Sequence, residues 1–303
     1  MILEYTEKLI ENLPENIKNG TTRLDLVLDG GVFNGSYLIG ALFFLKEMEK
    51  RKYVVVERIS GCSIGSLCGL LYCIDALELF YKLYELFLKD FKEGYYFKKI
   101  KEIGFYLKDV IPESLIEKVN NKLFITYYNI SSSKKKVKSV YKSKEDVIDS
   151  IIKSCFLPFI IDGNIMYKNK YIDGINPYIF TPETKGTRIL FLDLYGYDKV
   201  SCVINVKNEK SNFHRILVGM LDIHNFYIKQ TATSICSYTD EWGFAHNMHF
   251  LIKQMLERII ICSVYIIIAI KKIIPFKIRN HLIYKIMTKI FFVVYESLLE
   301  TMI

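Results

Sequence analysis

A serine between two glycines, in the run Gly61-Cys62-Ser63-Ile64-Gly65, has the spacing of a nucleophile elbow. In such an elbow, small flanking residues permit a strained strand-to-helix turn that presents a serine hydroxyl to a substrate carbonyl. The run follows a β-branched segment at 53–59, which predicts a strand, and precedes an apolar segment at 66–73, which predicts a helix. The short pattern alone would also suit a structural turn, but this context favours Ser63 as a nucleophile, with Gly61 and Gly65 as the small flanking residues.

A glycine-rich segment upstream of the serine could supply the second requirement of acyl transfer. This chemistry needs N–H donors aimed at the developing oxyanion, and a loop of small residues at a helix start can provide them. A phosphate-binding loop is excluded, because a dinucleotide fingerprint requires glycine where Val32 stands and a P-loop requires lysine where Ser36 stands. The candidate oxyanion donors are the backbone amides of Gly30, Gly31, Val32, Phe33, Asn34 and Gly35.

The serine also needs a base, and residue types alone leave its identity open. Two Asp-Gly pairs, Asp162-Gly163 and Asp173-Gly174, offer carboxylates downstream of the serine. Histidines are equally available, and none of them has the spacing of a metal site. They are His214, His224, His246, His249 and His281.

Both motifs together resemble the patatin-like phospholipase family. The run 29–35, followed by the apolar segment 36–45, is similar to the family's oxyanion loop and first helix, and 61–65 is similar to its elbow. Their order and spacing also match. The resemblance extends over about residues 22–195, roughly the first two thirds of the chain.

A third segment completes the resemblance and selects between the two aspartates. Ser154-Cys155-Phe156-Leu157-Pro158, followed by Tyr171-Ile172-Asp173-Gly174 and Asn176-Pro177, is similar to the family's stretch around its catalytic aspartate. The surroundings of Asp162 do not match in this way. The resemblance therefore implies that Asp173, in an Asp-Gly motif with Gly174, is the base.

The family resemblance implies a three-layer α/β/α fold and a Ser-Asp dyad in which Asp173 takes the proton of Ser63 without a histidine. It implies hydrolysis of fatty acyl esters in phospholipid or lysophospholipid, and it requires no metal or organic cofactor. The sequence departs from the family at three positions. Val32 replaces the usual third glycine, Asn34 stands where many members have a basic residue, and Ile175 replaces a small residue.

The elements that must position these residues follow from hydrophobic periodicity. Segments 24–29, 53–59 and 189–195 predict strands, 36–50, 75–91 and 112–121 predict helices, and 123–130 with 137–141 predict a hairpin whose basic tip is 131–136. Two strand-turn-helix units in tandem predict an α/β fold with a mostly parallel sheet flanked by helices. We expect a hydrolase domain over residues 1–256 and a separate tail over 257–303.

Composition narrows the setting in which the chain works. The amino terminus lacks the basic start and apolar core of a signal peptide, and the seven cysteines have no framework spacing, so we expect a cytoplasmic protein without disulfides. The net charge of +8 could attract nucleic acid or anionic lipid. No basic surface interleaved with aromatic residues is evident, so we expect no nucleic-acid binding.

The carboxy-terminal segment predicts membrane contact. The apolar run 259–270 would form a helix about 18 Å long, too short for a hydrocarbon core of about 30 Å. Residues 271–295 contain six basic residues and no acidic one, a pattern typical of an interfacial helix on an anionic membrane. Packing of this helical segment against the domain is the alternative.

Three functions stay open. The leading hypothesis is a lipid acyl-hydrolase that is peripherally associated with a membrane. Its rivals are a Ser-His-Asp esterase and an inactive patatin-like scaffold that binds lipid.

Overall fold

The computed structural model describes residues 2–181, 186–196, 199, 202–207 and 209–273. These residues form one seven-stranded sheet in the order β4-β3-β2-β1-β6-β7, with β5 paired to β3. The strands are β1 (Thr22–Leu28), β2 (Val54–Cys62), β3 (Leu123–Asn129), β4 (Lys134–Lys138), β5 (Tyr171–Asp173), β6 (Thr187–Leu192) and β7 (Cys236–Tyr238).

The sheet is parallel in its centre and antiparallel at its edges. Strand β1 pairs in parallel with β2 and β6, and β2 pairs in parallel with β3. Strands β4 and β5 run antiparallel to β3, and β7 runs antiparallel to β6. The predicted fold class, a sheet flanked by helices, is confirmed. The expectation of a mostly parallel sheet holds only for the centre, because a short connection such as 130–133 can join only antiparallel strands.

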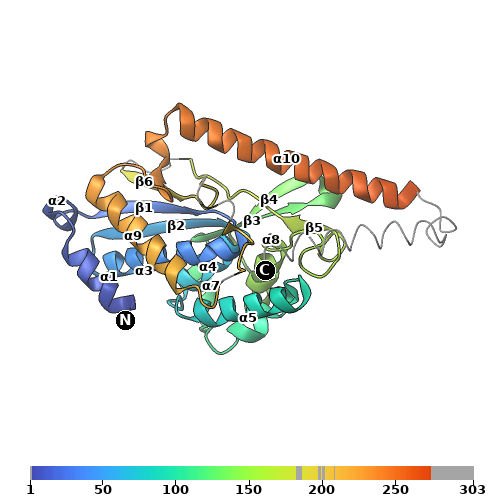
Figure 1. Cartoon of the computed structure of the whole chain (residues 1–303), viewed down its shortest axis with the longest axis horizontal. Helices are drawn as coiled ribbons and strands as arrows, with labels where there is room; N and C mark the ends of the chain where they lie inside the picture. The colour runs from blue at the N-terminus through green and yellow to red at the C-terminus, as the bar shows by residue number, and fades with distance from the viewer. Residues whose placement is uncertain (1, 182–185, 197–198, 200–201, 208, 274–303) are drawn as a thin grey trace.

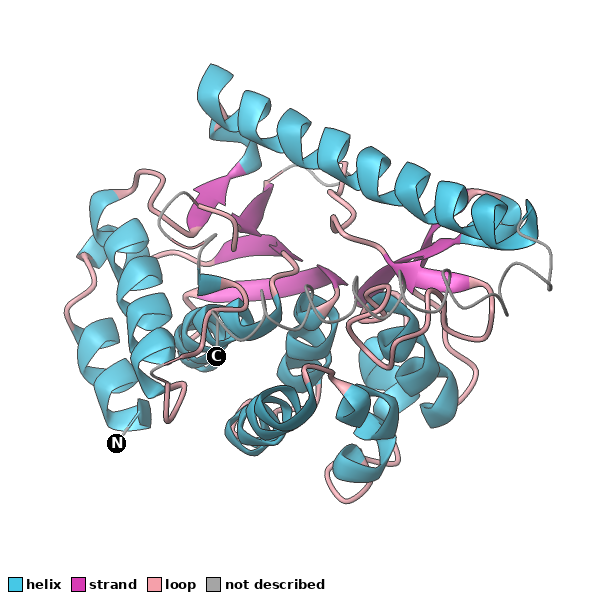
Figure 2. Ribbon diagram, turned by 45° about the vertical axis from the view of Figure 1, so that its right-hand side comes forward, coloured by secondary structure: helices cyan, strands magenta, loops and turns pink. Residues whose placement is uncertain are grey.

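Helices cover both faces of this sheet. Figures 1 and 2 show α10 lying across one side of the sheet, while α3, α4, α5 and α9 lie on the other side. The α-helices are α1 (Ile2–Glu11), α2 (Glu15–Lys18), α3 (Gly35–Lys50), α4 (Ile64–Cys73), α5 (Leu79–Gly94), α6 (Ile103–Leu107), α7 (Leu115–Val119), α8 (Lys144–Ser154), α9 (Phe213–Lys229) and α10 (Phe244–Ile273).

The central strand explains why both layers are needed. Leu24, Leu26 and Leu28 alternate along β1 and pack into the main core, while Val27 packs into a smaller core on the opposite face. A strand that is apolar on both faces must be covered on both sides. The glycine-rich loop and the turn at Ser63 begin at the carboxyl ends of two of these buried parallel strands, β1 and β2.

Helix α10 buries two charged and two apolar side chains on its inward face. Lys253, Glu257, Ile261 and Val264 recur on one face and are buried, whereas apolar side chains elsewhere on the helix are exposed. None of the described helices is long and apolar enough to cross a membrane. The domain boundary expected at residue 257 falls inside this continuous helix, and the division into two parts stays a prediction. The basic residues beyond position 273 lie outside the described residues.

The predicted hairpin is confirmed and its lysines at 134–136 are exposed, but they do not form its tip. The lysines at 134–136 belong to β4 rather than to the turn, which is formed by 130–132. Lys135 forms an ion pair of 2.9 Å with Glu257 of α10. Helices α5 and α7 begin three to four residues later than predicted, at Leu79 and Leu115.

Candidate active site

Ser63 occupies a strained turn between β2 and α4. Its backbone has φ 49° and ψ −131°, a conformation that non-glycine residues rarely adopt. The two motif glycines make the turn possible, since a Cβ on Gly61 would lie 2.6 Å from the Gly65 carbonyl oxygen. A Cβ on Gly65 would lie 2.5 Å from the carbonyl oxygens of Leu28 and Asp29. The glycine-serine-glycine spacing therefore follows from close backbone approach at this turn.

A serine of α8 anchors the turn from the side. The Ser63 N–H donates to Ser154 Oγ at 2.9 Å, and the Ser154 hydroxyl donates to the Thr126 carbonyl at 2.6 Å. The Ser66 hydroxyl donates to the Ser63 carbonyl at 2.7 Å. Ser63 itself is 8% exposed, so it is enclosed but still accessible at the cleft.

Asp173, at the end of β5, is a buried carboxylate. Its Oδ1 accepts the Ile175 N–H at 2.7 Å, and its Oδ2 has no hydrogen bond of normal length from the described residues. Burial raises the pKa of Asp173 to about 7, while the Ser63 hydroxyl and the Ile175 N–H act in the opposite direction. A carboxyl group with this pKa can accept a proton near neutral pH, which an exposed aspartate does poorly.

Both residues line the same cleft. Gly30, Gly31 and Val32 form one wall of it beside Ser63 and Asp173, and Tyr195 and Ile260 also contribute. The fold thus brings the three sequence motifs together from the ends of β1, β2 and β5. No described histidine lines this cleft. His281 lies outside the described residues.

The predicted oxyanion loop divides into free and occupied amides. The N–H of Gly30 donates to Asp29 Oδ1 at 3.0 Å, that of Phe33 to Val203, and that of Asn34 to Gly31. The Gly35 N–H is bonded within the short helical turn at 32–34. Among the described residues, the amides of Gly31 and Val32 have no hydrogen-bond partner, so these two are the candidate donors to an oxyanion.

The remaining predicted residues have structural contacts. The Asn34 side chain is fully buried, donates to the Leu194 carbonyl at 3.1 Å and accepts a 2.6 Å hydrogen bond from Arg215. A basic group thus reaches this loop from α9 although position 34 is not basic. Gly35 packs against Ile64, and Gly174 packs against the Thr126 backbone.

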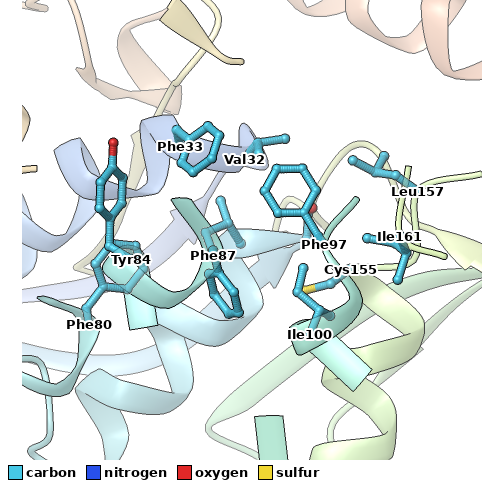
Figure 3. A pocket seen from close by; sticks show the side chains of 12 residues that line it. Val32, Phe33, Phe80, Tyr84, Phe87, Phe97, Ile100, Cys155, Leu157 and Ile161 are labelled. Atoms are coloured by element: carbon cyan, nitrogen blue, oxygen red, sulfur yellow. The ribbon is translucent and has the colours of Figure 1, made fainter. Parts of the chain in front are cut away.

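A second pocket opens on the other side of Ser63 and is lined largely by aromatic and aliphatic side chains. Figure 3 shows Phe33 and Phe97 facing this pocket together with Tyr84, Phe87 and Leu157. Rings of Phe91 and Phe97 stack behind it with centroids 4.7 Å apart. The pocket shares Val32, Ser63 and Leu157 with the cleft that contains Asp173, so Ser63 lies where the two meet.

The alternative bases are placed elsewhere. Asp162 forms a 2.9 Å ion pair with Lys101 and lines neither pocket at Ser63. His249 pairs with Asp193 at 2.9 Å, and His224 packs its ring against Phe44. Among the described residues, no group of histidine, cysteine, aspartate and glutamate side chains could hold a metal ion.

The sequence interpretation missed a group of charged residues behind the oxyanion loop: Asp29, Asp193 and Lys253. Both aspartates directly follow central strands, and Lys253 is one of few charges in an apolar helix, spaced four residues from His249 and Glu257. The spacing of His249, Lys253 and Glu257 was the signal available in the sequence, because it places these three side chains on one face of the helix.

The fold and this geometry define an α/β protein with an elbow serine facing a buried carboxylate. Residues 26–175 match the family model described as patatin-like phospholipase. The chain therefore carries a patatin-like phospholipase domain, and the resemblance predicted from its motifs is confirmed.

Curated relatives match at low identity. The omega-hydroxyceramide transacylase of Mus musculus is 27% identical over 155 residues, which cover 48% of this chain and 26% of the relative. The corresponding transacylase of Homo sapiens is 24% identical over 155 residues, which cover 48% of this chain and 29% of the relative. A 1-acylglycerol-3-phosphate O-acyltransferase of Homo sapiens is 24% identical over 205 residues, which cover 57% and 42%. The chain thus spans less than half the length of each of these relatives.

Proposed function

We propose that the chain is a lipid acyl-hydrolase that forms an acyl-enzyme on Ser63, with Asp173 as the base. The observation that carries this proposal is the single cleft in which Ser63, Asp173 and the free amides of Gly31 and Val32 meet. The raised pKa of Asp173 supports its role as a base. The absence of a described histidine from this cleft favours the dyad over a Ser-His-Asp esterase.

In the acylation half-reaction, Asp173 takes the Ser63 proton as Oγ attacks the ester carbonyl carbon. The carbonyl π electrons move to oxygen, and the Gly31 and Val32 amides donate to that oxyanion. Collapse of the intermediate breaks the bond to the alcohol, which leaves with the proton held by Asp173. The acyl group then remains on Ser63 as an ester.

Deacylation repeats these steps with water as the nucleophile. Asp173 removes a proton from water, hydroxide adds to the acyl carbon, and the same two amides hold the second oxyanion. The Ser63 alkoxide leaves and recovers the proton from Asp173. The products are a free fatty acid and the original enzyme, so the cycle consumes one water and needs no cofactor.

The apolar lining of the pocket in Figure 3 suits an acyl group as the group transferred, but its cavity of about 30 Å³ must widen before it can take a long chain. Its aromatic wall would remove a hydrocarbon chain from water, at about 0.8 kcal/mol for each buried methylene. The more polar cleft beside Asp173 would then hold the alcohol part of the ester. Phospholipid or lysophospholipid is the substrate class that fits this division.

Acyl transfer to a second alcohol is the other candidate. It is favoured by the names of the relatives, which are a transacylase and an acyltransferase. Hydrolysis and transfer share the acyl-enzyme and differ only in the acceptor. Supplying a lysolipid or a long-chain alcohol with the acyl donor and identifying the products by mass would distinguish them.

The same proposal places the protein at a membrane surface, on its cytoplasmic side. The outward face of α10 presents exposed Met255 and Ile259, which are 55% and 58% exposed, and this helix also contributes Ile260 to the cleft. Arg258, Lys271 and Lys272 are exposed on the same helix, whose described acidic residue, Glu257, is buried. Such a surface suits anionic lipid. All seven cysteines are free thiols, which suits a reducing compartment.

The decisive experiment compares wild type with Ser63→Ala on phospholipid and lysophospholipid, with fatty acid and lysolipid identified by mass. The variant should lose turnover by about three orders of magnitude or more, since it lacks the nucleophile, and should fold normally. Ser132→Ala, an exposed serine, is the matched control and should be fully active.

Activity of Ser63→Ala near the wild-type rate would contradict the proposal. A folded wild type that neither hydrolyses lipid nor reacts with a fluorophosphonate would instead support the inactive lipid-binding scaffold.

A further inference from the structure

Two carboxylates meet behind the oxyanion loop because of strand register. Leu28 of β1 pairs in parallel with Leu192 of β6, so the next residues, Asp29 and Asp193, leave the sheet side by side. Asp29 is fully buried, and the Asp193 side chain is largely buried. Two anions so placed repel each other and lose hydration, which is unfavourable unless a cation compensates.

One such cation is Lys253 of α10, which is 6% exposed, and His249 of the same helix also pairs with Asp193 at 2.9 Å. The Lys253 ammonium group donates to Asp29 Oδ2 and lies 3.3 Å from Asp193 Oδ1. The rings of Phe191 and Tyr195 surround it, with centroids 5.1 Å and 5.0 Å from Nζ. Burial alone would lower the pKa of Lys253, but the two carboxylates outweigh it and raise the pKa, so the lysine is charged at neutral pH.

Asp29 connects Lys253 to the oxyanion loop, because it bonds to both. Its Oδ1 accepts the Gly30 N–H at 3.0 Å, and its Oδ2 accepts the Leu194 N–H at 3.2 Å. Gly30 is directly followed by Gly31 and Val32, which line the Ser63 cleft and whose amides have no hydrogen-bond partner among the described residues. The orientation of those amides is therefore fixed from behind by a side chain that a helix far along the sequence holds in place.

Burial raises the pKa of Asp29 to about 7 although Lys253 opposes this rise, and the negative charge of the ionised Asp29 also reaches the cleft. Together with burial, it raises the pKa of the Cys62 thiol, next to Ser63, and that of the Tyr195 hydroxyl, which lines the cleft. An oxyanion forming on the Gly31 and Val32 amides would be destabilised by the same negative charge. A lysine paired with Asp29 offsets this effect.

From this geometry we infer that Lys253 is a positioning residue of the acyl-transfer site: it holds Asp29, and through it the oxyanion loop, and it neutralises the carboxylates behind that loop. This inference rests on the proposed function of Ser63. It extends the functional unit beyond the matched family segment, which ends at residue 175, to a helix that begins at Phe244.

The test measures kcat and KM on a soluble short-chain ester, per active site counted by fluorophosphonate labelling. Lys253→Met, close in shape but neutral, should lower kcat about tenfold or more and change KM little, because substrate contacts are kept. Lys253→Arg should restore much of kcat, since it keeps the charge. Lys229→Met, an exposed lysine at the end of α9 away from the cleft, is the matched control and should match wild type.

A purely structural lysine would change the fraction of labelled sites but not kcat per site, and that result would overturn the inference. If Lys253→Met does not fold, Lys253→Gln keeps a hydrogen bond to Asp29 without the charge, and wild-type kcat per site in that variant would overturn it equally. Failure of the proposed function is recognised separately, by activity that survives Ser63→Ala.

Discussion

Three residues that line the cleft have a backbone in the left-handed region. Ser63, Val32 and Ile175 have φ angles of 49°, 45° and 62°, which for the two β-branched residues are rare outliers. Each such residue costs about 1–3 kcal/mol and persists only where surrounding packing imposes it. Val32 and Ile175 are also positions where the family resemblance predicts a small residue. Their strain is thus a direct result of these departures.

The buried carboxyl group of Asp173 predicts a pH profile. Because burial raises its pKa to about 7, Asp173 is protonated in more acidic solution and cannot accept the Ser63 proton. We expect kcat/KM on a soluble ester to fall about tenfold per pH unit below that pKa and to level off above it. A rate that is flat between pH 5 and 8 would contradict Asp173 as the base.

Asp173→Asn should lose activity and gain stability. The folded-state pKa lies above the unfolded value, so the stability linked to protonation is present at low pH and is lost as pH rises through about 7. Asparagine remains neutral, so its thermal midpoint should exceed that of wild type at alkaline pH and approach it in acid. Calorimetry and ester assays at both pH values would measure this.

Asp162→Asn is the matched control, since this carboxylate is ion-paired with Lys101 away from the cleft. It should retain near wild-type activity and show no alkaline gain in stability. Equal loss of activity in both variants would argue against the choice of Asp173.

At the level of elements, α10 differs from an ordinary surface helix. Glu257 accepts hydrogen bonds from Asn176 at 2.6 Å and from Lys135 at 2.9 Å on its inward face. Further along, Tyr265 donates to the Ile130 carbonyl, and Ile261 and Val264 pack near Ile172. Residues 257–268 are therefore integrated with the domain, and removing them would disturb the strand that ends in Asp173.

Point substitutions on the outward face of α10 give a sharper test of membrane contact than truncation. Met255→Glu with Ile259→Glu should reduce cosedimentation with vesicles of phosphatidylcholine and phosphatidylserine by about tenfold or more, because each apolar side chain contributes about 1.5–3 kcal/mol when buried. Activity on a soluble ester should be unchanged, because neither side chain lines the cleft.

Phe105→Glu, an equally exposed apolar position on α6, is the control and should bind vesicles normally. Equal binding by the α10 variant and wild type would disprove membrane contact through this face.

At the scale of the whole molecule, local patterns predicted which segments meet at the Ser63 cleft. The central strands, the elbow at Ser63 and the glycine loop each follow from a few neighbouring residues, and their order along the chain carried the family resemblance. Asp173 was chosen by resemblance rather than by chemistry, and the structure brings it into the Ser63 cleft. Motifs of this kind can be recognised in a sequence because close backbone contacts, as at Gly61 and Gly65, leave room only for particular residues.

Long-range pairings could not be predicted in the same way. The ion pair between Asp29 and Lys253 joins residues 224 positions apart, and the contact of Arg215 with Asn34 joins residues 181 positions apart. Neither partner carries a local signal for the other. The antiparallel strands β5 and β7 were also missed, since their direction depends on which neighbour they pair with rather than on their own periodicity.

Helix geometry fixes the directions of the inward and outward side chains of α10 relative to each other. An α-helix turns by about 100° per residue, so inserting a single residue before Lys253 would rotate every later side chain away from its present direction. The ammonium group would leave the pair of aspartates, and apolar side chains would turn toward the sheet. The proposed lipid contact of the outward face and the loop geometry set by the inward face therefore depend on the same helical phase, so a shift that alters one also alters the other.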